Sequence, residues 1–133
     1  MTSKGVTDLI HKLPPRERQL FEALYMLKRA TAVELQDALE DAPSNSAIRV
    51  MLRRLEEKGF VTHREQDGRF VYSPAVPEQR LRQSALKRFV DTYFGGSSIG
   101  AAAALIGMSE KADPQELRDL ERLIEKVLKE DKE

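Results

Sequence analysis

Residues 44–72 constrain the fold of this chain most, because their apolar pattern changes from helical to strand spacing within one short stretch. Four apolar residues of the first half recur at helical intervals: Ile48, Met51, Leu52 and Leu55. Gly59 follows, and glycine readily takes the left-handed backbone conformation that ends a helix. We therefore predict a helix that begins after Ser44 or Ser46, runs to Lys58 and presents one apolar face to a core.

The second half of this stretch predicts a β-hairpin. The segments on either side of Asp67-Gly68 are rich in β-branched and aromatic residues. An Asp-Gly pair suits a type I′ turn, because both central residues of that turn need a positive φ. We expect an antiparallel hairpin that places Gln66 opposite Arg69 and His63 near Tyr72.

Two further helices are expected before this stretch. Residues 14–29 open with two prolines, which suit a first helical turn, and continue with an apolar stripe. Residues 31–40 begin with Thr31 three positions before Glu34, the spacing of a capping box in which each side chain satisfies a backbone N–H of the other residue. The order helix, helix, helix, hairpin is that of the winged variant of the helix-turn-helix.

The distribution of charge over residues 44–73 favours contact with a polyanion. The whole chain is neutral, with 22 Lys and Arg against 22 Asp and Glu, which by itself argues against a nucleic-acid partner. Arg64 and Arg69, however, lie near the expected hairpin tip. On a helical projection the face opposite the apolar stripe carries Ser46, Arg49, Val50, Arg53 and Glu57, with Arg54 on its flank.

This surface suits the major groove of DNA. Arginines can reach phosphates or guanine edges, a small apolar side chain can contact a thymine methyl group, and the amino terminus of a helix favours phosphate. Two alternatives stay open. The arginines can simply be solvated, with Arg53 paired to Glu56 or Glu57. A winged helix can also use this face to bind another protein without sequence-specific DNA binding.

Residues 73–79 separate two regions of the chain. Two prolines in this segment break regular structure, so we place a domain boundary there. We predict a winged-helix DNA-binding domain over residues 1–76 and a helical dimerisation domain over residues 77–133. The second domain is expected to contain helices over residues 78–94, 97–107 and 114–130.

The expected carboxy-terminal helices carry an unusually large apolar surface. The first is apolar over more than half of its circumference, and the last has a broad apolar stripe. Three helices can partly cover one another, but we favour a homodimer, which would also place two DNA-reading helices about one DNA turn or more apart. The residues assigned to this dimer are Leu81, Phe89, Tyr93, Phe94, Leu117, Leu120, Ile124 and Val127.

The composition argues against several other classes of protein. We find no phosphate-binding glycine loop, His-rich cluster or nucleophile–base pair, so we expect no enzyme, no cofactor and no metal site. The chain has no cysteine, which excludes disulfides and fits a reducing cytoplasm. No apolar run approaches the ~20 residues that span a bilayer, and the amino terminus lacks the apolar segment of a secretory signal. We expect a cytoplasmic protein.

A resemblance to a known family rests on four stretches: LFEAL in the first helix, LRRLEEKGFVTHREQDGRFVYSP, FVDTYFGGS and ELRDLERLI. Together they resemble the penicillinase-repressor (BlaI/MecI/CopY) family of bacterial winged-helix regulators, over nearly the whole chain. The resemblance implies a homodimeric transcriptional repressor on an inverted-repeat operator of double-stranded DNA, with the third helix in the major groove and the wing on the adjacent backbone. We therefore assign DNA contact to Ser46, Ala47, Arg49, Val50, Arg53, Arg54, Arg64 and Arg69.

The resemblance also implies release by a signal, and hence a signalling protease or a sensor as a further partner. The β-lactam-responsive members are inactivated by proteolysis at an Asn–Phe bond in the dimerisation region, where this chain has Ala104-Leu105. The copper-responsive members carry a carboxy-terminal cysteine motif that this chain lacks. Members often have threonines in place of Ala47 and Val50. Neither the operator sequence, the regulated genes nor the inducing signal follows from the sequence.

Overall fold

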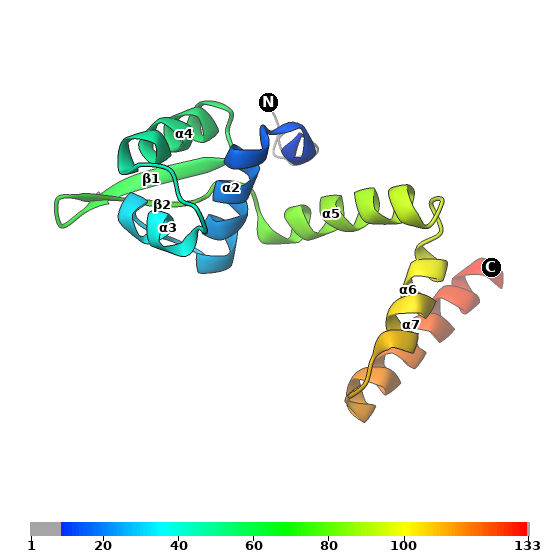
Figure 1. The fold of residues 1–133 in the computed structure, drawn as a ribbon. Coiled ribbons are helices and arrows are strands. Elements are labelled where there is room, and N and C mark those ends of the chain that lie inside the picture. Colours follow the sequence, from blue (N-terminus) through cyan, green and yellow to red (C-terminus); the bar gives the residue numbers. More distant parts are fainter. Residues whose placement is uncertain (1–8, 133) are drawn as a thin grey trace. The chain divides into compact units, whose positions relative to one another are not determined.

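The computed structural model describes residues 9–132, so the predicted absence of a secretory signal in the first twelve residues falls mostly outside it. It is mostly helical with one antiparallel β-hairpin, which confirms the predicted fold class (Figure 1). The elements in chain order are η1 (Ile10–Lys12), α2 (Pro15–Leu27), α3 (Ala32–Ala38), α4 (Asn45–Glu57), β1 (Val61–Gln66), β2 (Arg69–Pro74), α5 (Glu78–Tyr93), α6 (Ser98–Met108) and α7 (Pro114–Lys132).

Helices α2 and α3 form the support of the helix-turn-helix. The predicted capping box begins α3: the Glu34 N–H donates to Thr31 Oγ1 at 3.2 Å, and the Thr31 N–H donates to Glu34 Oε1 at 2.9 Å. Arg16 Nη2 donates to the carbonyl oxygen of Asp41 at 2.7 Å. This bond attaches the turn between α3 and α4 to α2, and so helps to fix where α4 begins.

Helix α4 follows the predicted pattern closely. Of the two candidate caps, Ser44 is the one used, because its Oγ accepts a hydrogen bond from the Ala47 N–H at 3.2 Å. The helix ends at Glu57, and Gly59 then takes the expected positive φ of 87°. Residues at the helical spacing of the apolar stripe face inward: Ile48, Leu52 and Leu55 are fully buried and Met51 is half-buried.

The hairpin has the predicted register, with Gln66 opposite Arg69 and His63 opposite Tyr72. Both turn residues have the positive φ that a type I′ turn requires, 54° at Asp67 and 77° at Gly68. Ala30 exchanges two backbone hydrogen bonds with Tyr72, at 2.9 and 2.8 Å. They fix β2 to the connection between α2 and α3, so the base of the hairpin is held by the helices.

A single apolar core lies between the helices and the hairpin described above. The rings of Phe21 and Phe60 meet edge to face, with centroids 5.8 Å apart. The core joins α2, α3, α4 and both strands through Leu20, Phe21, Leu24, Leu35, Ile48, Leu52, Leu55, Phe60, Val61 and Tyr72. Because α4 is packed from one side, its opposite face stays outside.

The chain forms two compact units that divide within α5, between Arg88 and Phe89. We call residues 9–88 the winged-helix unit and residues 89–132 the carboxy-terminal unit. This division lies later than the predicted boundary at 76/77, because the segment there packs on the first unit. The Ala75 N–H donates to the carbonyl oxygen of Phe60 at 2.8 Å, and Val76 is buried in the core.

Leu81 also belongs to that core, with 7% of its surface exposed. Our sequence-based assignment placed it in the dimer surface. The structure instead covers it within the winged-helix unit, so we leave it out of the dimer surface discussed below.

The carboxy-terminal unit has regular helices but almost no interior. Ser97 caps α6 by accepting a hydrogen bond from the Gly100 N–H at 2.9 Å, and Asp113 accepts one from the Gln115 N–H at the start of α7, also at 2.9 Å. Within residues 89–131, however, Ala101 is the single buried residue. The local signals for helix formation are satisfied here without a core that would hold the helices together.

Candidate nucleic-acid interface

The exposed face of α4 carries most of the residues assigned to DNA. Ser46, Arg49 and Arg53 are exposed, and Ala47 is half-buried near the helix amino terminus. Val50 lies among them with 38% of its surface exposed. The core contacts of α4 therefore leave a face of arginines and small side chains open to a partner.

Arg49 and Arg53 of this face line an open groove of about 1130 Å³, whereas Ser46, Ala47 and Val50 lie outside its lining. The opposite walls come from the amino-terminal turn of α3 and from the hairpin. The lining includes Arg49 and Arg53 of α4, Arg69 and Phe70 of β2, His63 of β1, and residues Thr31, Ala32, Val33 and Glu34 at the start of α3. In the view of Figure 1 the tip of the hairpin projects beyond α3 and α4. The amino terminus of α3, helix α4 and the hairpin thus direct polar and cationic side chains into the same groove.

The groove lining is balanced in formal charge, with Arg49, Arg53 and Arg69 against Glu34, Glu56 and Glu57. Two of the glutamates are already engaged. The hydrogen bonds from the backbone and hydroxyl of Thr31 lower the pKa of Glu34, with a further small effect of Arg69. Glu56 Oε1 lies 2.6 Å from His63 Nδ1. The arginines are therefore the charged groups of this lining that an incoming anion can best pair with.

His63 anchors the hairpin to α4, a role that the sequence analysis did not foresee. Its ring also lies against two aromatic rings of β2, with centroids 4.5 Å from Phe70 and 5.5 Å from Tyr72. Burial raises the pKa of the Tyr72 hydroxyl, Glu56 raises it further, and the nearby Arg49 and Arg53 lower it. The predicted pairing of His63 with Tyr72 was the only sequence signal for this cluster, because Glu56 approaches it from another element.

Arg54 differs from its neighbour Arg53. Its Nη1 lies 3.9 Å from Glu17 Oε2, and Lys58 Nζ donates to Glu17 Oε1 at 2.8 Å. The Glu17 side chain is only 5% exposed, so this carboxylate is nearly buried between α2 and the end of α4. Arg54 and Lys58 compensate that charge. Arg54 thus lies beside a carboxylate of its own fold, with 60% of its side chain still exposed.

Arg64 and Arg69 lie on the same face of the hairpin, because Arg69 is opposite Gln66 and Gln66 is two residues from Arg64. Successive residues of a strand point to opposite faces, so Arg64 is opposite in direction to His63, which lines the groove. Arg64 is exposed but is not part of the groove lining, whereas Arg69 is. Arg69, which directly follows the turn, lines the groove with Arg49 and Arg53, and Arg64 does not.

The assigned dimer residues beyond Leu81 lie in the carboxy-terminal unit and remain largely uncovered. Tyr93 is 72% exposed and Ile124 is 50% exposed. Phe89 packs beside Tyr93 and Phe94, with ring centroids 5.2 and 5.7 Å away. The other members are Leu117 and Val127, which are exposed, and Leu120, which is half-buried.

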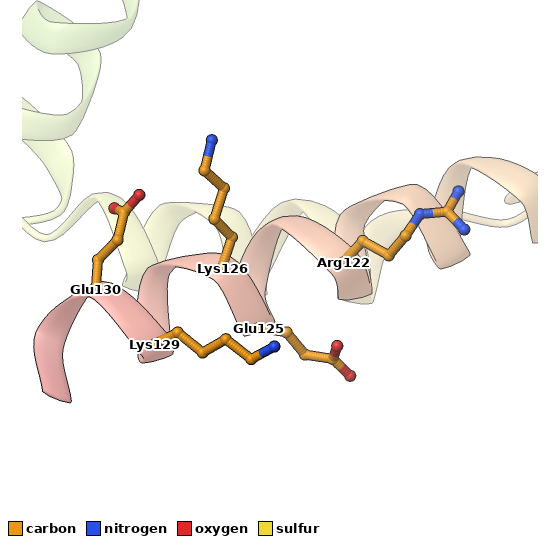
Figure 2. A pocket seen from close by; sticks show the side chains of 5 residues that line it. All are labelled: Arg122, Glu125, Lys126, Lys129 and Glu130. Carbon is orange, nitrogen blue, oxygen red and sulfur yellow. The ribbon is translucent and has the colours of Figure 1, made fainter. Parts of the chain in front are cut away.

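A shallow hollow of about 360 Å³ beside α7 does not have the character of a ligand site. It is lined by Arg122, Glu125, Lys126, Lys129 and Glu130, all from the same helix and of both signs. Figure 2 shows that these side chains spread along and away from α7 and do not converge on one point.

Within residues 9–132, no three His, Asp or Glu side chains are grouped as a metal site would require. No helix in the same range has the length and apolar character needed to cross a membrane.

Comparison with known proteins agrees with the resemblance seen in the sequence. The model of the penicillinase repressor family matches residues 13–126. The methicillin resistance regulatory protein MecI of Staphylococcus aureus strain N315 is 22% identical over 120 residues, which cover 87% of this chain and 95% of that protein. MecI of Staphylococcus epidermidis gives the same values.

A solved structure of an archaeal chromatin protein, TrmBL2, is also similar, with 20% identity and a TM-score of 0.45 over 86% of this chain and 45% of that chain. The family match is the more extensive finding, since it spans both units described above. Members of that family are transcriptional repressors and not enzymes. This winged-helix chain belongs to the penicillinase repressor family.

Proposed function

We propose that this repressor acts as a homodimer on an inverted-repeat operator, with α4 in the major groove and the hairpin on the adjacent backbone. One observation carries the proposal: Arg49 and Arg53 of α4 and Arg69 of the hairpin line the same groove. A convex helix flanked by a projecting hairpin fits a duplex, whose major groove admits one α-helix.

Each side chain of this surface has a distinct role in the proposal. Arg49 and Arg53 contact phosphates or guanine edges, and Val50 contacts a thymine methyl group. Ser46 and Ala47 are small, so the amino terminus of α4 can approach the DNA closely and direct its backbone N–H groups at phosphate. Arg69 and Arg64, both on the wing, neutralise phosphates beside the groove.

Arg54 takes a smaller part, because it already compensates Glu17. We assign it a long-range electrostatic contribution and no direct contact.

The dimer rests on the exposed apolar residues of the carboxy-terminal unit. Monomeric soluble proteins rarely expose large contiguous apolar patches, and a helix with a broad apolar stripe needs a partner surface. The residues that we assign to the interface are Phe89, Tyr93, Phe94, Leu117, Leu120, Ile124 and Val127. A twofold axis through this unit would present two copies of α4 to the two halves of an inverted repeat.

Release from the operator by a signalling protease or a sensor partner is part of the proposal, and we place the whole cycle in the cytoplasm. The residues that match the cleaved bond of β-lactam-responsive members, Ala104 and Leu105, lie inside α6. A protease would therefore have to act on a locally unwound α6, which a unit without a core permits more readily than a packed one.

Selection of binding sites from random duplex DNA with the full chain tests this function. We expect enrichment of a palindromic site. On that site the logarithm of the binding constant should fall with the logarithm of salt concentration with a slope of about −4 to −7, if four to eight phosphates are neutralised by Arg49, Arg53, Arg64 and Arg69 of two protomers.

A dimer that binds no duplex at low salt would contradict the proposal. That result would favour the alternative in which the α4 face binds a protein. An enriched site without twofold symmetry would contradict the inverted repeat alone.

A further inference from the structure

The start of α5 is held to the winged-helix unit by a cluster of polar side chains. Three donors meet at a single carboxylate oxygen, Glu78 Oε1. Lys28 Nζ donates to it at 2.9 Å, Arg82 Nη2 at 3.1 Å and the Tyr25 hydroxyl at 3.3 Å. We call Tyr25, Lys28, Glu78 and Arg82 the α5 latch.

The backbone of Lys28 supports a specific role for its side chain. Lys28 closes α2 with a φ of 75°, a conformation that glycine adopts with less strain than any residue with a Cβ. A lysine nevertheless stands there, and its ammonium group reaches Glu78 across 50 positions of sequence. The same ammonium lies 5.7 Å from the centre of the Tyr25 ring, which favours the cation from a second side.

The latch acts together with apolar packing on the same turn of α5. Leu81 is buried in the winged-helix core, and its N–H donates to the carbonyl oxygen of Pro77 at 3.2 Å. The buried Leu81 side chain holds α5 against the winged-helix unit. The polar contacts of Glu78 oppose rotation of α5 about that attachment. The lowered pKa of Glu78, about 2, has the hydrogen bond from Lys28 as its main cause, followed by that from Arg82.

We propose that the α5 latch sets the direction in which α5 leaves the DNA-binding unit, and thereby selects the separation of the two operator half-sites. The inference rests on the proposed dimeric function. An added base pair between the half-sites rotates one of them by about 35° about the DNA axis and moves it by about 3.4 Å. A dimer in which the direction of α5 is fixed should bind poorly when the separation of the half-sites changes. A dimer in which α5 can change direction should bind several separations. Glu78, Lys28 and Arg82 are positioning residues, because they act on DNA only through the orientation of α5.

Two measurements on the full chain test this proposal. The first is the distance distribution between spin labels at Asp37→Cys on α3 and Gln83→Cys on α5, which the absence of native cysteine makes free of background. We expect a narrow distribution in the parent chain and a broad one after Glu78→Gln. The second is site selection from random duplex DNA. The parent chain should enrich palindromes of one half-site separation, and Glu78→Gln should enrich several.

Variants separate the latch from general stability. Pairs as exposed as these contribute little to the free energy of unfolding, so Glu78→Gln should leave the thermal midpoint nearly unchanged. Lys28→Gly removes the ammonium while it relieves the backbone, and it should broaden both distributions without destabilisation. Glu110→Gln, an exposed position outside the latch with the same loss of charge, is the matched control and should change neither.

The possible outcomes distinguish two claims: that the latch fixes the direction of α5, and that this direction selects the half-site separation. Equal label distances in the parent chain and Glu78→Gln would overturn the latch. Broadened distances with an unchanged half-site separation would overturn its effect on specificity. If the parent chain enriches no palindrome at all, the proposed function fails and the role in operator spacing fails with it.

Discussion

The winged-helix unit and the carboxy-terminal unit differ in how they cover their apolar side chains. The first closes a core among α2, α3, α4 and the hairpin, in which Leu20, Leu52 and Leu55 are fully buried. In the second, residues 89–131 contain helices with good caps but a single buried residue, Ala101. Both units follow local helix signals equally well, so the difference lies entirely in packing.

This difference agrees with our proposal that the first unit folds by itself and that a partner covers the second. In the winged-helix unit, the core fixes α4 without using Arg49, Val50 or Arg53. These three side chains therefore stay exposed and available to a partner. In the second unit, apolar residues such as Ile124 and Tyr93 are exposed, and covering them would supply the driving force for the proposed assembly. Each of the following changes should affect one unit and spare the other.

The largest expected effect is on assembly, from Ile124→Asp in α7. A carboxylate in the proposed interface would have to be buried without a partner, so the dimer should dissociate. A monomer reads one half-site, and operator affinity should fall by about 10³-fold or more, toward the level of non-specific binding. Sedimentation and operator titration measure the two effects. The control is Lys126→Asp, on the charged side of the same helix. A dimer that survives Ile124→Asp would remove α7 from the interface.

The next effect is on the winged-helix core, from Leu52→Ala. This side chain is fully buried, and the cavity should lower the free energy of unfolding by about 2–5 kcal/mol. Because the core lies within one chain, the loss should be independent of protein concentration. Urea unfolding at two concentrations provides the check. A loss that disappears at high concentration would mean that the unit borrows its stability from the partner.

A neighbouring pair of arginines should separate the DNA face from the scaffold. Arg53→Gln removes a cation from the groove, so binding to every duplex should weaken and the salt slope should become shallower by about 2 per dimer. Arg54→Gln should change the slope much less, because Arg54 is already paired with Glu17. Fluorescence anisotropy across a salt series measures both. Equal changes in slope would show that Arg54 also contacts phosphate.

Two helix caps provide a smaller and matched comparison. Thr31→Ala removes the cap of α3, and Ser97→Ala removes that of α6. Each should cost about 1 kcal/mol. The first should appear as a lower unfolding free energy of the winged-helix unit, and the second as weaker dimerisation, measured by urea unfolding and by dilution respectively. A Ser97→Ala variant with unchanged dimer affinity would indicate that α6 does not fold together with the interface.

The smallest effect concerns acid sensitivity at Glu78. Its pKa in the folded chain is about 2, against an ordinary value of 4.5, because Lys28 and Arg82 favour the carboxylate. A group with a lowered pKa contributes its stability fully above 4.5 and loses it as the pH falls toward 2. Between these values the parent chain should lose slightly more stability than Glu78→Gln, as measured by urea midpoints. Parallel pH curves would show that the latch does not form in solution.

The sequence was sufficient for those parts of the fold that depend on neighbours along the chain. The helical stripe of Ile48, Leu52 and Leu55, the capping box at Thr31, and the Asp67-Gly68 turn with its register are all confirmed. Each is a local signal with one dominant geometry. Together they also fix which face of α4 stays exposed, and so most of the candidate DNA surface.

Contacts between distant positions were beyond the reach of sequence patterns. Glu17 and Lys58 meet across 41 positions, and nothing in either local pattern distinguishes this pair from ordinary surface charges. The same holds for Leu81, whose helical spacing does not reveal which unit covers it. The contribution of the α3 amino terminus and His63 to the groove likewise follows only from tertiary packing.

The molecular mass of the full chain in solution tests most directly whether the carboxy-terminal unit is completed by a second copy. Sedimentation equilibrium over a wide concentration range should give twice the 15.1 kDa of one chain, with dissociation only at high dilution. A mass of 15.1 kDa at every concentration, with the helices of residues 89–132 intact by circular dichroism, would contradict the twofold arrangement and the operator symmetry that depends on it.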